Sequence, residues 1–215
     1  MALDDARRTM VDRQLVDRGI ADRAVLGAMG RVPRHRFVPS ALQDYAYADG
    51  PLEIGADQTI SQPYVVALMT ELIAPGPEMR VLEVGTGSGY QAAVLAELVD
   101  SVFSVEIIPE LAHEARARLA ELGYENIEVR IGDGYDGWPE RAPFDAILVT
   151  AAPPTIPEPL LDQLIPGGRM VIPVGRRYQD LLVITRTEDG FERETVTGVR
   201  FVPMTGKIDD APDGG

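Results

Sequence analysis

The segment from Val81 to Tyr90 is the part of the chain whose composition most clearly indicates ligand binding. It reads Val-Leu-Glu-Val-Gly-Thr-Gly-Ser-Gly-Tyr, follows a short apolar run and precedes a helical pattern. Glycines at every second position let the backbone turn sharply and approach a ligand closely. Glu106 ends the next apolar run, residues 102–106. A carboxylate at such a strand end can accept hydrogen bonds from both hydroxyls of a ribose.

Three interpretations of this loop are open: a dinucleotide site, an S-adenosylmethionine site and a purely structural turn. The dinucleotide pattern G-x-G-x-x-G requires a third glycine where the chain has Tyr90. Glu83 lies just before the loop, and its charge disfavours a pyrophosphate but suits a cation. We therefore favour S-adenosylmethionine, whose sulfonium and ammonium groups are positive. The residues predicted to contact it are Glu83, Gly85, Thr86, Gly87, Ser88, Gly89 and Glu106.

A second short glycine motif, Gly132-Asp133-Gly134, follows the third predicted strand. Strand ends of a parallel sheet meet at one edge, so this motif should face the same ligand as the first loop. The Asp133 carboxylate can accept a hydrogen bond from the amino group of an adenine. A plain turn is the alternative interpretation.

Ser61 is the candidate for contact with a substrate anion. It precedes Gln62-Pro63 and an amphipathic run over residues 64–74, so we expect it to cap a helix that has proline in its first turn. A helix start offers free N–H groups and the positive end of a dipole, and the hydroxyl of Ser61 can donate to a carboxylate. From the residues alone, a simple helix cap is the favoured interpretation of Ser61, and contact with a substrate anion is the alternative.

The surrounding elements alternate between strands and helices. Strands are expected over residues 80–84, 101–106, 127–131, 144–150 and 168–174, and helices over 88–99, 109–122 and 156–164. This alternation predicts an α/β, doubly wound, Rossmann-like sheet that is mostly parallel. Combined with the S-adenosylmethionine interpretation of the glycine loop, it indicates the class I methyltransferase fold. Only six residues separate Val174 from Leu181, too few for a parallel crossover. The strands 181–186 and 191–199 should therefore be antiparallel, with a hairpin turn at Asp189-Gly190.

The first part of the chain reads differently. We expect helices over residues 4–18 and from Asp22 onward, an extended link over 31–39 and loops over 45–59. The predicted organisation is an N-terminal helical and substrate-loop extension over residues 1–75. It is followed by a cofactor-binding core over 76–207 and a flexible tail over 208–215.

The overall composition excludes several classes of protein. The 215 residues carry 20 Lys and Arg against 34 Asp and Glu, a net charge of −14. Such a balance disfavours nucleic acid and anionic membrane surfaces as partners. The sequence has no cysteine, no signal-like start and no long apolar run. We expect a cytoplasmic monomer without a metal site.

Several motifs together resemble the protein-L-isoaspartate O-methyltransferase family. They include Met10-Val-Asp-Arg-Gln-Leu15, Val32-Pro-Arg-His-Arg-Phe-Val-Pro39, Gln58-Thr-Ile-Ser-Gln-Pro63 and Val199-Arg-Phe-Val-Pro-Met-Thr205. The resemblance covers roughly residues 7–207. The glycine loop is shared by many methyltransferases, whereas the Thr-Ile-Ser-x-Pro loop and the Val-Pro-x-Thr ending are far more specific. The chain departs from the family pattern at Asp57 and Tyr64.

The resemblance implies methyl transfer from S-adenosylmethionine to the α-carboxyl group of L-isoaspartyl residues in damaged proteins, which is a repair reaction. It implies a catalytic and substrate-binding role for Ser61, a substrate-binding role for the backbone near Val202, and places for Thr59 and Thr205 at the cofactor. A small-molecule methyltransferase with the same cofactor site is the alternative.

A carboxylate is already ionised at neutral pH, so no general base is needed. The net charge predicts that added salt helps, or does not harm, the capture of acidic peptides.

Overall fold

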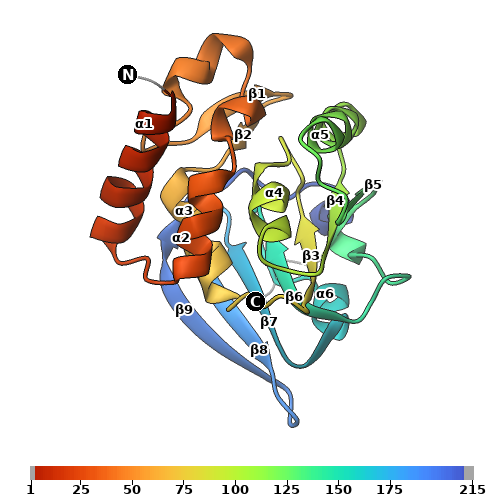
Figure 1. Ribbon diagram of the computed structural model, residues 1–215. Coiled ribbons are helices and arrows are strands. Elements are labelled where there is room, and N and C mark those ends of the chain that lie inside the picture. The colour runs from red at the N-terminus through yellow and green to blue at the C-terminus, as the bar shows by residue number, and fades with distance from the viewer. Residues whose placement is uncertain (1–2, 211–215) are drawn as a thin grey trace.

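The computed structural model of the protein describes residues 3–210 (Figure 1). A seven-stranded sheet forms its centre. Its strands are β3 (Arg80–Val84), β4 (Ser101–Glu106), β5 (Ile127–Ile131), β6 (Phe144–Val149), β7 (Leu164–Val174), β8 (Gln179–Arg186) and β9 (Phe191–Val199). Their spatial order is β5-β4-β3-β6-β7-β8-β9. The first five strands in this spatial order, β5-β4-β3-β6-β7, pair in parallel, whereas β8 is antiparallel to both β7 and β9. The predicted fold class and the antiparallel ending are confirmed.

Side chains alternate between the two faces of the sheet, and each face has its own core. Val81 and Val102 belong to a cluster that also contains residues of α3 (Pro63–Leu72) and α4 (Tyr90–Ala96). Their neighbours Leu82 and Phe103 belong to a second cluster, which includes α6 (Glu158–Asp162) and the C-terminal segment. Helix α5 (Pro109–Glu121) lies beside β4 and β5. Apolar residues on both faces explain why the strands read as continuous hydrophobic runs.

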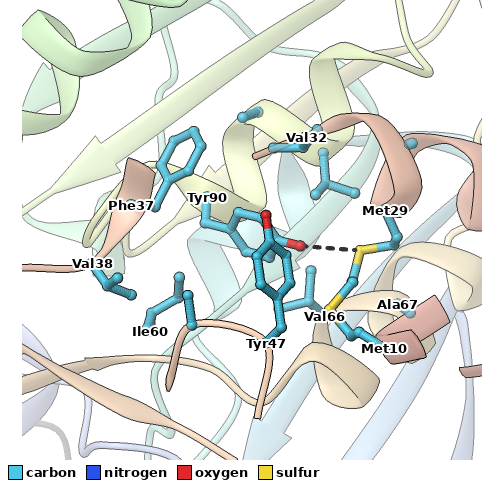
Figure 2. Packing of buried hydrophobic residues seen from close by; sticks show 14 of the residues in the cluster. Met10, Met29, Val32, Phe37, Val38, Tyr47, Ile60, Val66, Ala67 and Tyr90 are labelled. Carbon is cyan, nitrogen blue, oxygen red and sulfur yellow. Dashed lines mark hydrogen bonds between the residues drawn. The ribbon is translucent and has the colours of Figure 1, made fainter. Parts of the chain in front are cut away.

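The N-terminal extension packs onto this core through the helices of one face. Its elements are α1 (Leu3–Thr9), η1 (Met10–Leu15), η2 (Val16–Arg18), α2 (Arg23–Arg31), η3 (Arg34–Phe37) and η4 (Ser40–Tyr45). Met10, Met29 and Phe37 gather around Tyr90 at the start of α4 (Figure 2). The Tyr90 hydroxyl lies 3.7 Å from the sulfur of Met29. Tyr90, which replaces the third glycine of a dinucleotide loop, therefore joins the extension to the core.

Local structure in the extension differs from the sequence prediction at three places. The helix over 4–18 is confirmed in position, but it becomes a π-helix from Met10 and then a 3-10 turn. The predicted extended link contains the 3-10 helix η3. The predicted loop over 45–59 contains an antiparallel hairpin of β1 (Leu52–Gly55) and β2 (Gln58–Ile60). Such short strands carry too few residues to show an alternating pattern.

The hairpin turn explains one departure from the family pattern. Ala56 and Asp57 have φ values of +50° and +56°. Two consecutive residues in the left-handed region form the turn that matches the twist of paired strands. Aspartate tolerates this conformation better than most residues do, so Asp57 has a structural reason to be there.

The C-terminal segment is tied to the core along residues 202–208. The amide of Ala152 donates to the carbonyl of Val202 at 2.8 Å, and the amide of Met204 donates to the carbonyl of Ala152 at 2.9 Å. Ile208, in η6 (Lys207–Asp210), is 1% exposed. The predicted tail therefore begins with a buried residue in η6, whereas residues 211–215 lie outside the described part, and the division of the chain stays a prediction. No helix within residues 3–210 has the length and apolar character needed to cross a membrane.

Candidate active site

A cavity of about 860 Å³, counting the open space at its mouth, lies at the carboxyl ends of β3, β4 and β6. The amide of Gly85 donates to Val105 at 2.8 Å and the amide of Thr150 donates to Val84 at 2.9 Å, so these three strand ends are fixed to one another. The cavity lies where the chain crosses from one half of the sheet to the other. Ligands of open α/β sheets bind at this switch point.

Most of the residues predicted for the site meet here. The lining includes Thr59, Ser61, Gly85, Thr86, Gly87, Ser88, Glu106, Gly134, Val202 and Thr205. Four predicted residues do not line it: Glu83, Gly89, Gly132 and Asp133. Gly89 instead caps α4 with a φ of +87°. Gln58, Ile107 and Thr150 line the cavity without having been predicted.

The glycine loop has a steric reason for its composition. Gly85 has a φ of +97°, and a Cβ there would lie under 3.0 Å from the Thr150 hydroxyl oxygen. That hydroxyl donates to the Gly85 carbonyl at 2.6 Å, so it cannot move away without losing a hydrogen bond. At Gly134 a Cβ would meet the side chain of Val84 in the same way. The two glycines thus allow the loop backbones to pack closely against the ends of neighbouring strands beside the cavity.

Glu106 is held rigidly at the edge of the cavity. Its side chain is 5% exposed, and its two oxygens accept from the amide of Gly87 at 2.8 Å and from the amide of Ile108 at 2.9 Å. A carboxylate has about four acceptor positions, so two remain for a ligand. This geometry suits the two hydroxyls of a ribose, and the apolar neighbour Ile107 can pack against an adenine.

Glu83 lies beneath the loop rather than in the cavity. It is fully buried and hydrogen-bonded to the Ser104 hydroxyl, which lies 2.5 Å from the hydroxyl of Thr86 in the cavity lining. Burial raises the pKa of Glu83 to about 8, with a further contribution from the charge of Glu106 and an opposing one from the Ser104 hydrogen bond. Glu83 is thus linked to the cavity lining through Ser104 and Thr86, and its direct contact with a cofactor stays a prediction.

The protonation of Glu83 predicts a stability that depends on pH. The unfolded chain releases this proton near 4.5, whereas the folded protein keeps it until about 8. Unfolding therefore releases a proton between these values, and this contribution to the free energy of unfolding falls by about 2 kcal/mol from pH 6 to pH 8. Urea unfolding should show that Glu83→Gln lacks this loss and gains on the wild type as pH rises. The exposed Glu53→Gln variant is the control, and a parallel pH profile for Glu83→Gln and wild type would contradict the prediction.

Ser61 differs from its predicted structural role. Gln62 occupies the N-cap position and α3 begins at Pro63, so the prediction that Ser61 caps the helix is wrong. Within residues 3–210 no hydrogen bond engages the Ser61 hydroxyl. The Ser61 carbonyl accepts from the Arg34 guanidinium at 2.7 Å. The backbone of Ser61 is held while its hydroxyl stays available.

Arg34 is the supporting residue that sequence reasoning missed. It is fully buried, donates from Nε to the Ala46 carbonyl at 2.7 Å, and lies 4.8 Å from the centre of the Tyr90 ring. Burial lowers the pKa of Arg34, and the neighbouring hydroxyl group of Tyr90 opposes that shift. The motif that contains Arg34, residues 32–39, also contains the exposed Arg36, so the sequence gives no signal that tells the buried arginine from the exposed one.

Asp133 connects the second glycine motif to the C-terminal segment. Its carboxylate accepts from the amide of Tyr135 at 2.9 Å and from the amide of Lys207 at 2.7 Å. These bonds hold the residues that follow Thr205 against the cavity. A role for Asp133 toward an adenine stays a prediction.

A broad groove adjoins the cavity. We call it the outer groove; its lining includes Tyr64, Arg177, Tyr178, Arg200 and Phe201. It shares Thr59, Ser61, Thr150, Val202 and Pro203 with the cavity. Tyr64, the second departure from the family pattern, has the Arg18 guanidinium 3.7 Å from its ring centre. Ser61 therefore lies at the junction of an enclosed site and an open one.

A glycine loop at the switch point, a strand-end carboxylate and helices on both faces define the class of Rossmann-like, S-adenosylmethionine-dependent methyltransferases. Solved structures agree with this class. A protein-L-isoaspartate O-methyltransferase is 31% identical with a TM-score of 0.85, covering 94% of this chain and 67% of that one. A Plasmodium falciparum protein described as of the same kind, in complex with S-adenosyl-L-homocysteine, is 26% identical with a TM-score of 0.80, covering 93% and 98%.

Sequence comparison gives the family. The profile of the protein-L-isoaspartate(D-aspartate) O-methyltransferase family matches residues 6–209, and the chain belongs to this family. A Picosynechococcus protein-L-isoaspartate O-methyltransferase is 58% identical over 200 residues, covering 93% of this chain and 90% of the relative. A Syntrophobacter fumaroxidans protein-L-isoaspartate O-methyltransferase 1 is 57% identical over 203 residues, covering 94% and 95%.

Proposed function

We propose that the protein transfers a methyl group from S-adenosylmethionine to the α-carboxyl group of L-isoaspartyl residues in damaged proteins and peptides. The observation that carries this proposal is the position of Ser61 in a chain of this family. Its hydroxyl has no partner among the described residues and lies where the cavity meets the outer groove. An extended peptide in the groove can present a carboxylate to Ser61, and a ligand in the cavity can meet it there.

Each group of residues has a separate task in this proposal. The bound cofactor supplies an electrophilic methyl group. Glu106 and the backbone of the glycine loop hold it, and Ile107 contributes apolar contact. Ser61 donates a hydrogen bond to the substrate carboxylate and orients one of its oxygens. Because a carboxylate is already ionised, no residue has to remove a proton. Orientation is the main contribution, and in ideal cases it lowers a barrier by about 7–11 kcal/mol.

Neither histidine has a place in this chemistry. His35 bonds through Nδ1 to the hydroxyl of Tyr47 at 2.8 Å, and burial lowers the pKa of its imidazole. His113 is exposed on α5. Neither lines the cavity.

The decisive experiment compares an isoaspartyl peptide with its aspartyl twin. Methyl transfer from labelled S-adenosylmethionine should label only the isoaspartyl form. Equal labelling of both peptides, or labelling of neither, would overturn the proposal. A small-molecule substrate is the second candidate, but the open outer groove beside Ser61 favours a peptide. The cytoplasmic location and the monomeric state stay predictions.

A further inference from the structure

The outer groove has a charge opposite to that of the chain as a whole. The protein carries a net charge of −14, yet the charged side chains that line the groove are Arg18, Arg176, Arg177, Arg200 and Asp180. Four of these five are cations. An acidic protein has thus gathered positive charge at the place where its substrate would lie.

Two of these arginines have no carboxylate to neutralise them. Several exposed arginines elsewhere form ion pairs with acids, as in Arg31–Glu97, Arg36–Glu121, Arg130–Glu140 and Arg141–Glu128. Arg18 in the groove is likewise committed to Asp49 at 3.3 Å. Arg177 and Arg200 are exposed, and neither forms an ion pair with any residue in the range 3–210. What distinguishes Arg177 and Arg200 from other arginines without an ion pair is their place in a groove whose lining has four arginines and one acid, and this local excess of positive charge suits an external anion.

The relative position of these arginines is fixed by the structure. Arg177 lies in the loop between β7 and β8, and Arg200 follows β9. The Gln179 side chain joins the two segments. Its Nε2 donates to the backbone carbonyl of Phe201 at 3.1 Å, and its Oε1 accepts from the backbone N–H of Phe201 at 2.6 Å. Gln179 is 8% exposed, so water competes little for these bonds. The backbone segments that carry the two arginines are therefore held together at the same groove.

Tyr178 completes the surface. Its side chain is 93% exposed beside Arg177 and lines the same groove. An aromatic ring held in water by a short loop offers apolar contact to a peptide at little entropic cost. The outer groove thus combines an aromatic side chain with positive charge, which suits an extended peptide that carries carboxylates.

We infer that Arg177 and Arg200 make the enzyme prefer peptides with acidic residues beside the methylated residue. This inference rests on the proposed function and adds to it a substrate preference. Exposed charges act through water and salt, with a Debye length of about 8 Å at physiological ionic strength. Added salt should therefore weaken the capture of acidic peptides, which is opposite to the salt effect predicted from the net charge.

The test uses two isoaspartyl peptides that differ only in Glu or Gln on both sides of the isoaspartyl residue. At low salt the wild type should give a kcat/KM about fivefold higher for the Glu peptide, the size expected of two exposed ion pairs. The preference should shrink toward one in 0.5 M sodium chloride. The Arg177→Gln/Arg200→Gln variant should lose this preference and give the same kcat/KM for the two peptides.

A matched variant separates local from global charge. Arg23→Gln/Arg193→Gln removes two exposed charges that do not line the groove, so it should keep the preference. Equal use of the two peptides by the wild type, or equal loss in both double variants, would overturn the inference. Binding of the same peptides by fluorescence anisotropy measures the preference without methyl transfer. Failure to methylate the Gln peptide would contradict the proposed function instead, and the anisotropy would still decide the charge preference.

Discussion

Gly85→Ala should abolish measurable cofactor binding and lower the free energy of unfolding by about 2–5 kcal/mol. Two physical costs add in this variant. A residue with a Cβ at a φ of +97° loses about 1–2 kcal/mol. The new methyl group also meets the Thr150 hydroxyl oxygen, and overpacking of this kind costs about 1–3 kcal/mol. Relief of the clash would displace the backbone that lines the cavity. Urea unfolding and calorimetric titration with S-adenosyl-L-homocysteine would measure the two effects.

Two controls separate these costs. Gly19 has a φ of +96°, and a Cβ there would meet nothing within 4 Å. Gly19→Ala should therefore show the conformational cost alone and bind cofactor normally. Adding Thr150→Ala to Gly85→Ala removes the clashing oxygen, so the double variant should be more stable than the sum of the single variants predicts. Equal destabilisation by Gly19→Ala and Gly85→Ala, or normal cofactor affinity of Gly85→Ala, would show that the clash has no consequence.

Ser61→Ala should lower kcat for an isoaspartyl peptide by about a hundredfold, as removal of one hydrogen-bond donor to a reacting oxygen does in other enzymes. The affinity for S-adenosyl-L-homocysteine should stay within about twofold of the wild type, since cofactor binding depends on the loop and on Glu106. The fold should also be unaffected, because the Ser61 hydroxyl bonds to no residue in the described part of the chain. Single-turnover kinetics would measure the rate of the chemical step directly.

Ser40→Ala provides the matched control, since Ser40 is exposed in η4 and lines neither the cavity nor the outer groove. It should be indistinguishable from the wild type in both measurements. A Ser61→Ala enzyme that keeps its rate would remove Ser61 from the catalytic machinery. A variant that instead loses cofactor affinity in proportion to its rate would assign Ser61 a binding role only.

The core of the fold was predictable because its signals are local. The strands from β3 to β7 are rich in Val, Ile and Leu, and the connecting segments contain helix start signals, such as Pro109 at the start of α5. The six-residue interval after Val174 was enough to predict an antiparallel ending, since a parallel crossover needs more chain. The hairpin β1–β2 was not predictable, because strands of three and four residues are defined by their pairing and not by their composition.

Site residues were predictable where the residue type alone indicates ligand binding. They were less predictable where the role depends on contacts with residues distant in the sequence. Glycines that let a ligand approach the backbone closely, and a carboxylate at a strand end, can be recognised in the sequence. The position of Glu83 could not be predicted, because the neighbouring residues in the sequence do not indicate that its carboxylate faces Ser104 beneath the loop. Arg34 contacts Ser61 across a sequence separation of 27 residues. Only folding brings such partners together.

The sequence by itself determined the fold class, the glycine loop with Glu106, the family motifs around Ser61 and the sign of the net charge. The tertiary structure decided how the charged residues are distributed over the surface, and so which sign of charge lies beside the outer groove. A sum over the chain treats every ionised group alike, whereas salt limits each exposed group to its own neighbourhood. Folding pairs several arginines with carboxylates, such as Arg31 with Glu97, but within residues 3–210 it leaves Arg177 and Arg200 without an ion pair beside the groove. An acidic chain thereby presents a positive surface at the place where its substrate must bind.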